Sequence, residues 1–333
     1  MGDLPTISMA LPWQGETWSQ LLRQLDAEQL PHAILLAGVR HSGKAQLALA
    51  LARFLLCHQP ESGQNCGKCH ACELSRAGTH GDFLWLQPAE PSRVIKIDQV
   101  RQMVEFANKT TSLGRRKVIV LSPADSLTTQ AANALLKSLE EPADGTYIIL
   151  VCNRLHALPV TVRSRCQMLK LLMPERDQAL QWLDNLTGGR ADSEQMLALA
   201  GGQVMLAAQR YQDADMELAG KVQDALNALA SGTGTVAQLA TLLTDEPIEG
   251  LLSQLHGHLQ LRIQRMDARA LASPAGRRTF ALLDDLIQLQ RVVLSGANPN
   301  RQLVIDSLSL RFERELGVGR GGDSINRLQG SHR

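Results

Sequence analysis

The run Gly38-Val39-Arg40-His41-Ser42-Gly43-Lys44-Ala45 decides the fold of the first part of the chain. Its G-x-x-x-x-G-K spacing is typical of a phosphate-binding loop, in which glycines let backbone N–H groups close on phosphate oxygens and the lysine reaches the terminal phosphates. Residues 32–37 before it, apolar apart from His32, predict a buried strand, and residues 46–56 after it predict a helix. The sequence therefore predicts an α/β domain with this loop between a strand and a helix.

Ala45 departs from the pattern at its last position. An active loop carries Ser or Thr there, because the hydroxyl helps to hold Mg²⁺, and alanine has no oxygen to offer. Gly38, Gly43 and Lys44 could still contact a phosphate, so we interpret the loop as degenerate, with no turnover of ATP expected. Whether ATP binds at all stays open, since Lys44 could equally be a residue without a ligand.

A second loss lies at the end of the predicted strand over residues 117–121. In a phosphate-loop ATPase this strand ends in Asp, for Mg²⁺, and usually in Glu, for the attacking water. Here it ends in Ser122-Pro123, and the next acid, Asp125, is expected to point elsewhere. An active enzyme would need an unusual Mg²⁺ site to make up for both losses, so the sequence favours a chain that does not hydrolyse ATP.

Four cysteines follow the predicted helix with the spacing C-x8-C-x2-C-x2-C, at Cys57, Cys66, Cys69 and Cys72. Four thiolates so close in sequence are typical of a tetrahedral Zn²⁺ site. Because four protein ligands leave no open position, we predict a structural zinc module over residues 57–72. Two alternatives stay open: four reduced thiols without a metal, or His70 in place of one cysteine, with Cys57 the ligand in question.

Composition excludes several classes of protein. The chain has 333 residues, 44% of them hydrophobic and 20% charged, as in ordinary soluble globular proteins. A net charge of +1 gives no general case for a nucleic-acid or membrane-surface protein. Residues 1–5 lack a secretion signal, and no apolar run approaches the ~18 residues of a membrane span. We therefore expect a cytoplasmic protein without membrane contact.

The chain from Met173-Pro174 onward has helical periodicity. Short segments at residues 178–186, 194–200 and 204–211 predict a small helical unit, and a longer helical region over 215–315 follows. That region packs either on itself alone or also on partners. The predicted domains are residues 1–172, 173–213 and 214–316, followed by a tail, 317–333, whose glycine and charge predict disorder.

Three further motifs carry a resemblance to a known family. They are the run 132–142 (ANALLKSLEEP), Leu158-Pro159, and Ser164-Arg165-Cys166. With the cysteine cluster and Ala77-Gly78-Thr79-His80, they make the chain resemble the clamp-loader branch of the AAA+ ATPases over about residues 32–170. The chain departs from the family's usual turn at Gly81, where proline is common.

The resemblance implies a fold and an assembly. The fold is a RecA-like AAA+ domain, with a parallel sheet and flanking helices, followed by a helical lid (173–213) and an all-α collar (214–316). In the family, five subunits form a ring that loads the sliding clamp on primed DNA. A chain with a degenerate loop would be a non-hydrolysing (stator) subunit of the bacterial DNA polymerase III clamp loader. It would share in the DNA-directed DNA polymerase activity of the holoenzyme only as a member of the complex.

The resemblance also implies roles for single residues. In the family, the arginine of the Ser-Arg-Cys motif reaches the ATP of the neighbouring subunit, so Arg165, between Ser164 and Cys166, is implied to be an arginine finger acting in trans. The alternative for Arg165 is a local ion pair. Asn153 stands where active members sense the γ-phosphate and could still do so. Val204-Met205 stands where motors present an arginine on the sensor 2 helix.

The implied partners are motor subunits of the gamma/tau type and a delta subunit. The sliding clamp would be contacted indirectly, and primer–template DNA would be met within the complex. The implied location is the cytoplasm, in the replisome at the nucleoid. Zinc is the implied cofactor. Two other functions stay open: an active AAA+ motor of replication or recombination, and a zinc-dependent nucleic-acid binder. The losses at Ala45 and Ser122-Pro123 argue against the first. Balanced charge, 3% aromatic residues and one closed cysteine cluster argue against the second.

Overall fold

The computed structural model describes residues 4–114, 116–189, 193–194, 196–197, 200, 202–212, 216–230, 233–234, 236–243, 248–264, 266–294 and 300–316. The chain divides into two compact units between Gln178 and Ala179. The domain boundaries predicted at 172 and 213 stay predictions, and residue 213 lies outside the described residues. The tail predicted to be disordered, 317–333, also lies outside them.

The first unit is built on one five-stranded sheet with the order β2-β3-β4-β1-β5, in which every pair is parallel. Its strands are β1 (Ala33–Ala37), β2 (Phe83–Leu86), β3 (Lys117–Leu121), β4 (Thr146–Cys152) and β5 (Gln167–Lys170). Its helices are α1 (Gly15–Asp26), α2 (Lys44–Leu56), α3 (His70–Arg76), α4 (Ile97–Asn108), α5 (Thr129–Glu140) and α6 (Val160–Arg163), with short 3-10 turns η1 (Pro12–Gln14), η2 (Ala124–Ser126) and η3 (Leu155–Ala157). The predicted parallel sheet with flanking helices is confirmed.

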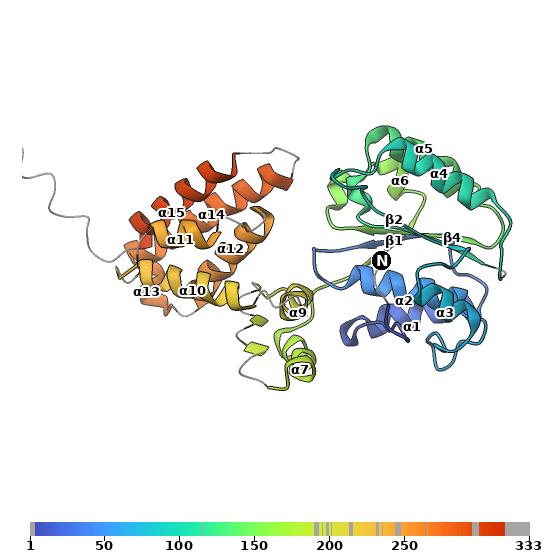
Figure 1. Ribbon diagram of the computed structural model, residues 1–333, viewed down its shortest axis with the longest axis horizontal. Helices are drawn as coiled ribbons and strands as arrows, with labels where there is room; N and C mark the ends of the chain where they lie inside the picture. Colours follow the sequence, from blue (N-terminus) through green and yellow to red (C-terminus); the bar gives the residue numbers. More distant parts are fainter. Residues whose placement is uncertain are drawn as a thin grey trace, which may run out of the picture. The chain divides into compact units, whose positions relative to one another are not determined.

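Helices cover both faces of this sheet. Figure 1 shows α4, α5 and α6 on one side and α1, α2 and α3 on the other. Alternate residues of β1 therefore enter two different cores: Leu35 packs in the cluster with α4 and α5, and Ile34 and Leu36 pack in the cluster with α1 and α2. A strand buried on both faces reads as an unbroken apolar run, which explains the sequence pattern at 33–37.

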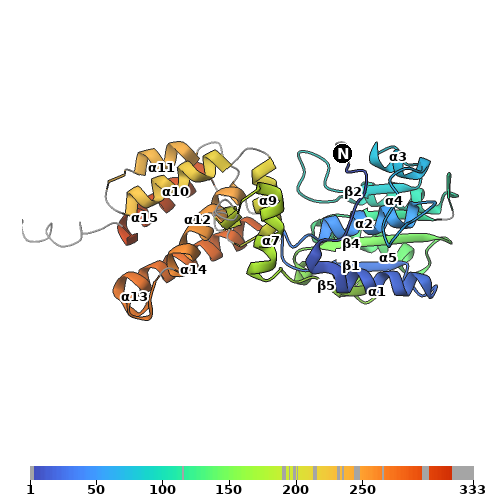
Figure 2. The ribbon, with the colours of Figure 1, turned by 90° about the horizontal axis from the view of Figure 1, so that it is seen from below.

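The second unit is helical in the residues that the structure describes. Its helices are α7 (Arg176–Thr187), which begins just before the division, α9 (Val204–Gln212), α10 (Met216–Ala230), α11 (Val236–Leu243), α12 (Ile248–Gln264), α13 (Ala268–Ala272), α14 (Pro274–Leu294) and α15 (Arg301–Leu316). In Figure 2, α12 and α14 run side by side, and α14 also packs against α15. Residues at the predicted helical spacing form its core, among them Val222, Leu226, Leu251, Leu255, Leu259, Leu282 and Leu286. Within the described parts of the chain, the helices are all too short or too polar to cross a membrane.

Arg53 holds three segments of the first unit together. It lies on α2 with only 1% of its surface exposed, and its guanidinium has no carboxylate among the acceptors that we describe. It donates instead to Ser8 Oγ at 2.8 Å, to Ser75 Oγ at 3.1 Å and to the carbonyl of Thr6 at 3.1 Å. A further N–H reaches the carbonyl of Pro5. The N-terminal segment and α3 are thereby fixed to α2.

Replacing Arg53 by Ala should destabilise the protein by about 3 kcal/mol, because buried carbonyls and hydroxyls would lose their donors and a cavity would remain. Urea unfolding of the whole chain measures the change. Arg23→Ala, at an exposed position of α1, is the matched control and should change stability by less than ~0.5 kcal/mol. Equal stability of the two variants would contradict the role assigned to Arg53.

Candidate functional site

The glycine loop lies between β1 and α2, as the sequence predicts, at the carboxyl edge of the sheet. Two of its glycines are required by geometry. Gly43 has φ +87°, a conformation that residues with a side chain rarely adopt. A Cβ on Gly38 would lie 2.3 Å from the carbonyl oxygen of Leu171, which follows β5. The loop therefore closes tightly onto the neighbouring strand.

Lys44 is turned back onto its own loop. The side chain is 3% exposed, and its ammonium donates to the carbonyl of Val39 at 2.5 Å and to Ser42 Oγ at 3.4 Å. Burial lowers the pKa of Lys44 to about 8, although the charge of Asp125 acts in the opposite direction. In this arrangement the amine that would meet a phosphate is occupied by protein oxygens.

The N-terminal segment covers the loop. The indole N–H of Trp13 donates to the carbonyl of Ser42 at 3.1 Å, and the side-chain amide of Gln14 donates to the carbonyl of Gly43 at 2.9 Å. A Cβ at Gly43 would also meet Leu11, at 2.3 Å. Sequence reasoning missed these contacts, because residues 11–14 carry no local pattern that points to a loop some thirty residues further on.

The end of β3 offers no carboxylate for Mg²⁺ at the usual place, since Ser122-Pro123 follows the strand directly. The carboxylate of Asp125 is 4% exposed. It accepts the backbone N–H of Asn153 at 2.8 Å and Nε of Arg154 at 3.0 Å. Both of its oxygens thus bond the segment after β4, and its charge also acts on Lys44 of the glycine loop.

The four cysteines lie together. The sulfurs of Cys57, Cys66, Cys69 and Cys72 all lie within 4.8 Å of one another. Two of the separations are 3.9 Å, between Cys57 and Cys69, and 4.0 Å, between Cys66 and Cys72. A tetrahedral ion with metal–sulfur bonds of ~2.3 Å needs sulfurs about 3.8 Å apart, so the four thiols could hold one metal ion.

Cys57 belongs to this group, and His70 does not. The His70 ring is exposed, with Nδ1 4.0 Å from the carboxylate of Glu73. Burial raises the pKa of the Cys57 thiol to about 12, so a bound cation would be needed to hold it as a thiolate. Asn65, fully buried beside the cluster, donates to the sulfur of Cys72 at 3.5 Å and accepts the backbone N–H of Ser8 at 2.8 Å. The cluster is thereby joined to the N-terminal segment.

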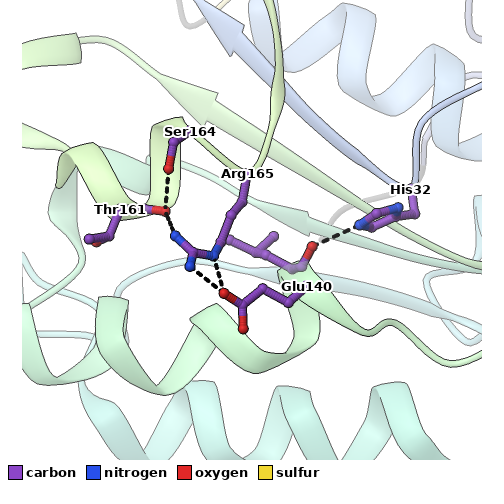
Figure 3. A network of polar contacts seen from close by, with 6 residues as sticks. His32, Glu140, Thr161, Ser164 and Arg165 are labelled. Carbon is purple, nitrogen blue, oxygen red and sulfur yellow. Dashed lines mark hydrogen bonds and ion pairs between the residues drawn. The ribbon is translucent and has the colours of Figure 1, made fainter.

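Arg165 lies away from the loop, in the turn between α6 and β5. Figure 3 shows its guanidinium between Thr161 and Glu140. Nε donates to Glu140 Oε1 at 2.5 Å, Nη2 contacts the same oxygen, and Nη1 donates to the carbonyl of Thr161 at 2.9 Å. The local ion pair that the sequence left open is therefore formed, and one third of the Arg165 side chain is still exposed.

The neighbours of Arg165 in its motif hold the turn in place. The Ser164 hydroxyl donates to the carbonyl of Thr161 at 3.2 Å. The thiol of Cys166 donates to the carbonyl of Val162 at 3.3 Å, and burial raises the pKa of that thiol to about 12. Cys166 therefore bonds the preceding helical turn through its thiol.

The sheet separates Arg165 from the loop of its own chain. Gln167 pairs with Ile34 at the start of β1, and Leu171 N donates to Ala37 at the end of β1. The turn and the strand between Arg165 and Leu171 span roughly 15–20 Å at ~3.3 Å per strand residue. Arg165 thus lies at the amino edge of the sheet and the loop at the carboxyl edge. A phosphate held at the loop of this chain would therefore lie at the opposite edge of the sheet from this guanidinium.

A five-stranded parallel sheet between helices, with a glycine loop after one strand and a helical second part, defines the AAA+ class of fold. A solved gamma subunit-related protein of DNA polymerase III from Thermotoga maritima has a similar fold, with a TM-score of 0.54 at 18% identity, over 89% of this chain and 98% of that one. The family model described as "DNA polymerase III, delta subunit" matches residues 13–175.

Two relatives narrow the assignment. The DNA polymerase III subunit delta' of Pseudomonas aeruginosa is 34% identical over 92% of this chain and 98% of that protein. The corresponding subunit of Escherichia coli K12 is 31% identical over 92% of this chain and 96% of that protein. The chain belongs to the family of DNA polymerase III delta-prime subunits.

The cysteine geometry predicts about one bound metal ion per purified chain, since four thiolates can satisfy one tetrahedral ion. Elemental analysis measures it. Cys69→Ser should lower the metal content severalfold, because a serine hydroxyl is a poor replacement for a thiolate. Cys166→Ser removes a thiol outside the cluster and should leave the metal content unchanged. An unaltered metal content in Cys69→Ser would exclude the site.

Proposed function

We propose that this chain is a non-hydrolysing subunit of the DNA polymerase III clamp loader. It would help to assemble the pentameric ring that loads the sliding clamp on primed DNA and would supply Arg165 in trans to a neighbouring ATPase subunit. The observation that carries the proposal is the position of Arg165. It is one third exposed and lies at the amino edge of the sheet, separated from its own loop by the length of β5. Family membership supports the same role.

The state of the glycine loop supports the proposal that the isolated chain is not an enzyme. Ala45 and Ser122-Pro123 leave Mg²⁺ without its usual protein ligands, and Lys44 is occupied by Val39 and Ser42. If ATP meets Gly38, Gly43 and Lys44 at all, we propose that it is not hydrolysed there. The chain would contribute to DNA polymerase activity as a member of the holoenzyme.

Arg165 would act by electrostatics. A guanidinium that is already in place when the neighbour's terminal phosphate reacts stabilises the charge that develops on its oxygens. Arginine suits this task, since it stays charged and presents paired N–H donors to a planar or tetrahedral anion. Ser164 and Cys166 would serve the finger through the turn that their hydrogen bonds hold.

We propose that zinc is the metal of the cysteine cluster and that its role is structural. Thiolate ligands in a tetrahedral arrangement favour Zn²⁺, and four protein ligands leave no position for a reacting water. The contacts of Asn65 and Arg53 with the N-terminal segment give the cluster a role in holding that segment.

Residues 214–316 would form the collar through which the subunits associate. On α15, Ile305, Leu308 and Phe312 face the core of the helical unit, and on the same helix Leu303 and Leu310 are 67% and 59% exposed. Leucines seven residues apart lie on one face of a helix. We propose that this face contacts gamma/tau-type motor subunits or the delta subunit. The chain would meet the sliding clamp and primer–template DNA only within the complex. Residues 173–213 would form the lid.

In a reconstituted clamp loader, Arg165→Ala should lower ATP turnover at least tenfold, about 1.4 kcal/mol in barrier, because the neighbour's reacting phosphate loses a charge partner. Lys44→Ala should change turnover less than about twofold, and the isolated wild-type chain should not hydrolyse ATP. Steady-state phosphate release measures all three.

The opposite pattern would support the alternative, an active AAA+ motor of replication or recombination. Hydrolysis by the isolated chain that Lys44→Ala abolishes would refute the non-hydrolysing role. A complex that turns over ATP normally with Arg165→Ala would refute the arginine finger.

A carboxylate at the exposed face of α15 should weaken assembly. Leu303→Glu and Leu310→Glu should each raise the dissociation constant of the complex about tenfold or more, because a charge would be desolvated at the interface. Gln102→Glu, at an exposed position of α4, is the control and should assemble normally. Analytical ultracentrifugation with the other subunits measures the effect, and normal assembly of both leucine variants would exclude this face.

A further inference from the structure

Glu140 is the last residue of α5 and approaches Arg165 from the side of the guanidinium. One carboxylate oxygen, Oε1, takes the N–H of Nε at 2.5 Å and also contacts Nη2. In this side-on arrangement two donors on one edge of the guanidinium meet one charged acceptor, which restricts the direction of the group. Figure 3 shows the carboxylate against that edge.

Some N–H groups of Arg165 are not used by Glu140 or Thr161. An arginine has five N–H groups. Nε and one N–H of Nη2 are taken by Glu140, and one N–H of Nη1 is taken by the carbonyl of Thr161 at 2.9 Å. Each terminal nitrogen therefore keeps one N–H for an outside acceptor. A pair of N–H groups on neighbouring nitrogens suits two oxygens of one phosphate.

The two groups that hold Arg165 come from different helices, and both helices are anchored. Glu140 ends α5, where the ring of His32, just before β1, bonds the carbonyl of the preceding residue, Leu139, at 2.8 Å. Thr161 belongs to α6, whose following turn is held by Ser164. The Arg165 guanidinium is thus bound on two sides, by Glu140 and by the carbonyl of Thr161.

We propose that Glu140 is a positioning residue for Arg165: its carboxylate fixes the guanidinium so that the terminal N–H pair faces the nucleotide of the neighbouring subunit. This inference rests on the proposed role of Arg165 as a finger in trans. An arginine without such a partner samples many rotamers, and donors that must be ordered during the reaction contribute less than donors already in place. Glu140 touches no reacting atom and acts only through Arg165.

The test is ATP hydrolysis by the reconstituted clamp loader, with kcat and KM measured separately. Glu140→Ala should lower kcat by about three- to tenfold and leave KM within about twofold, because positioning acts on the transition state. Glu140→Gln keeps an oxygen at the same place and should recover most of the loss. Glu141→Ala is the matched control, since Glu141 is the adjacent, exposed carboxylate. A complex with this variant should hydrolyse ATP at the wild-type rate.

A double substitution separates positioning from a general structural effect. With Arg165→Ala present, Glu140→Ala should have no further effect on kcat, because Glu140 acts through that arginine alone. Assembly of each complex, measured by size-exclusion chromatography, should equal that of wild type. A kcat loss that adds to that of Arg165→Ala, or one that follows loss of assembly, would overturn the positioning role.

The outcomes also separate this inference from the proposed function. Arg165→Ala could lower kcat while Glu140→Ala leaves kcat unchanged or raises it. In that case Arg165 is a finger, but Glu140 does not position it. An increase would mean that the carboxylate withholds the arginine. If Arg165→Ala has no effect, the finger itself is refuted and the role of Glu140 falls with it.

Discussion

The direction of the parallel strands is the constraint on which the rest of the structure depends. All five strands run the same way, so everything that follows a strand lies at one edge and everything that precedes a strand lies at the other. The glycine loop follows β1, and Arg165 precedes β5, the strand beside it. The two groups that could meet phosphate therefore face opposite ways. The two groups of one chain are thus kept apart by the sheet, which is why the role proposed for Arg165 requires a neighbouring subunit.

Local patterns explain what the sequence could predict. The strand, loop and helix over residues 32–56 follow from an apolar run, a glycine spacing and a helical period. The cysteine cluster follows from spacing alone, because its ligands are close in the chain. The contacts of Arg53, Trp13 and Glu140 could not be predicted, since each joins segments that lie far apart in the sequence and leaves no periodic trace in it.

The N-terminal segment shows why the missed contacts matter. Ser8 is bound to Arg53 and Asn65 beside the cysteine cluster, and Trp13 and Gln14 are bound to the glycine loop. One short segment therefore rests on both features that the sequence singled out. Neither the cluster nor the loop is an isolated motif in the folded chain, because the same N-terminal segment contacts both.

Folding alone requires most of the glycine-loop sequence, whether or not the loop takes part in catalysis. Gly38 is required by the carbonyl of Leu171, and Gly43 by its positive φ and by the contact with Leu11. Lys44 satisfies the carbonyl of Val39 inside the loop. Position 45 has no such task, since the hydroxyl expected there would serve only a metal ion. The G-x-x-x-x-G-K pattern thus has a folding role at each of its defining positions. Because these positions are explained by folding, a phosphate-loop pattern alone is weak support for ATP hydrolysis.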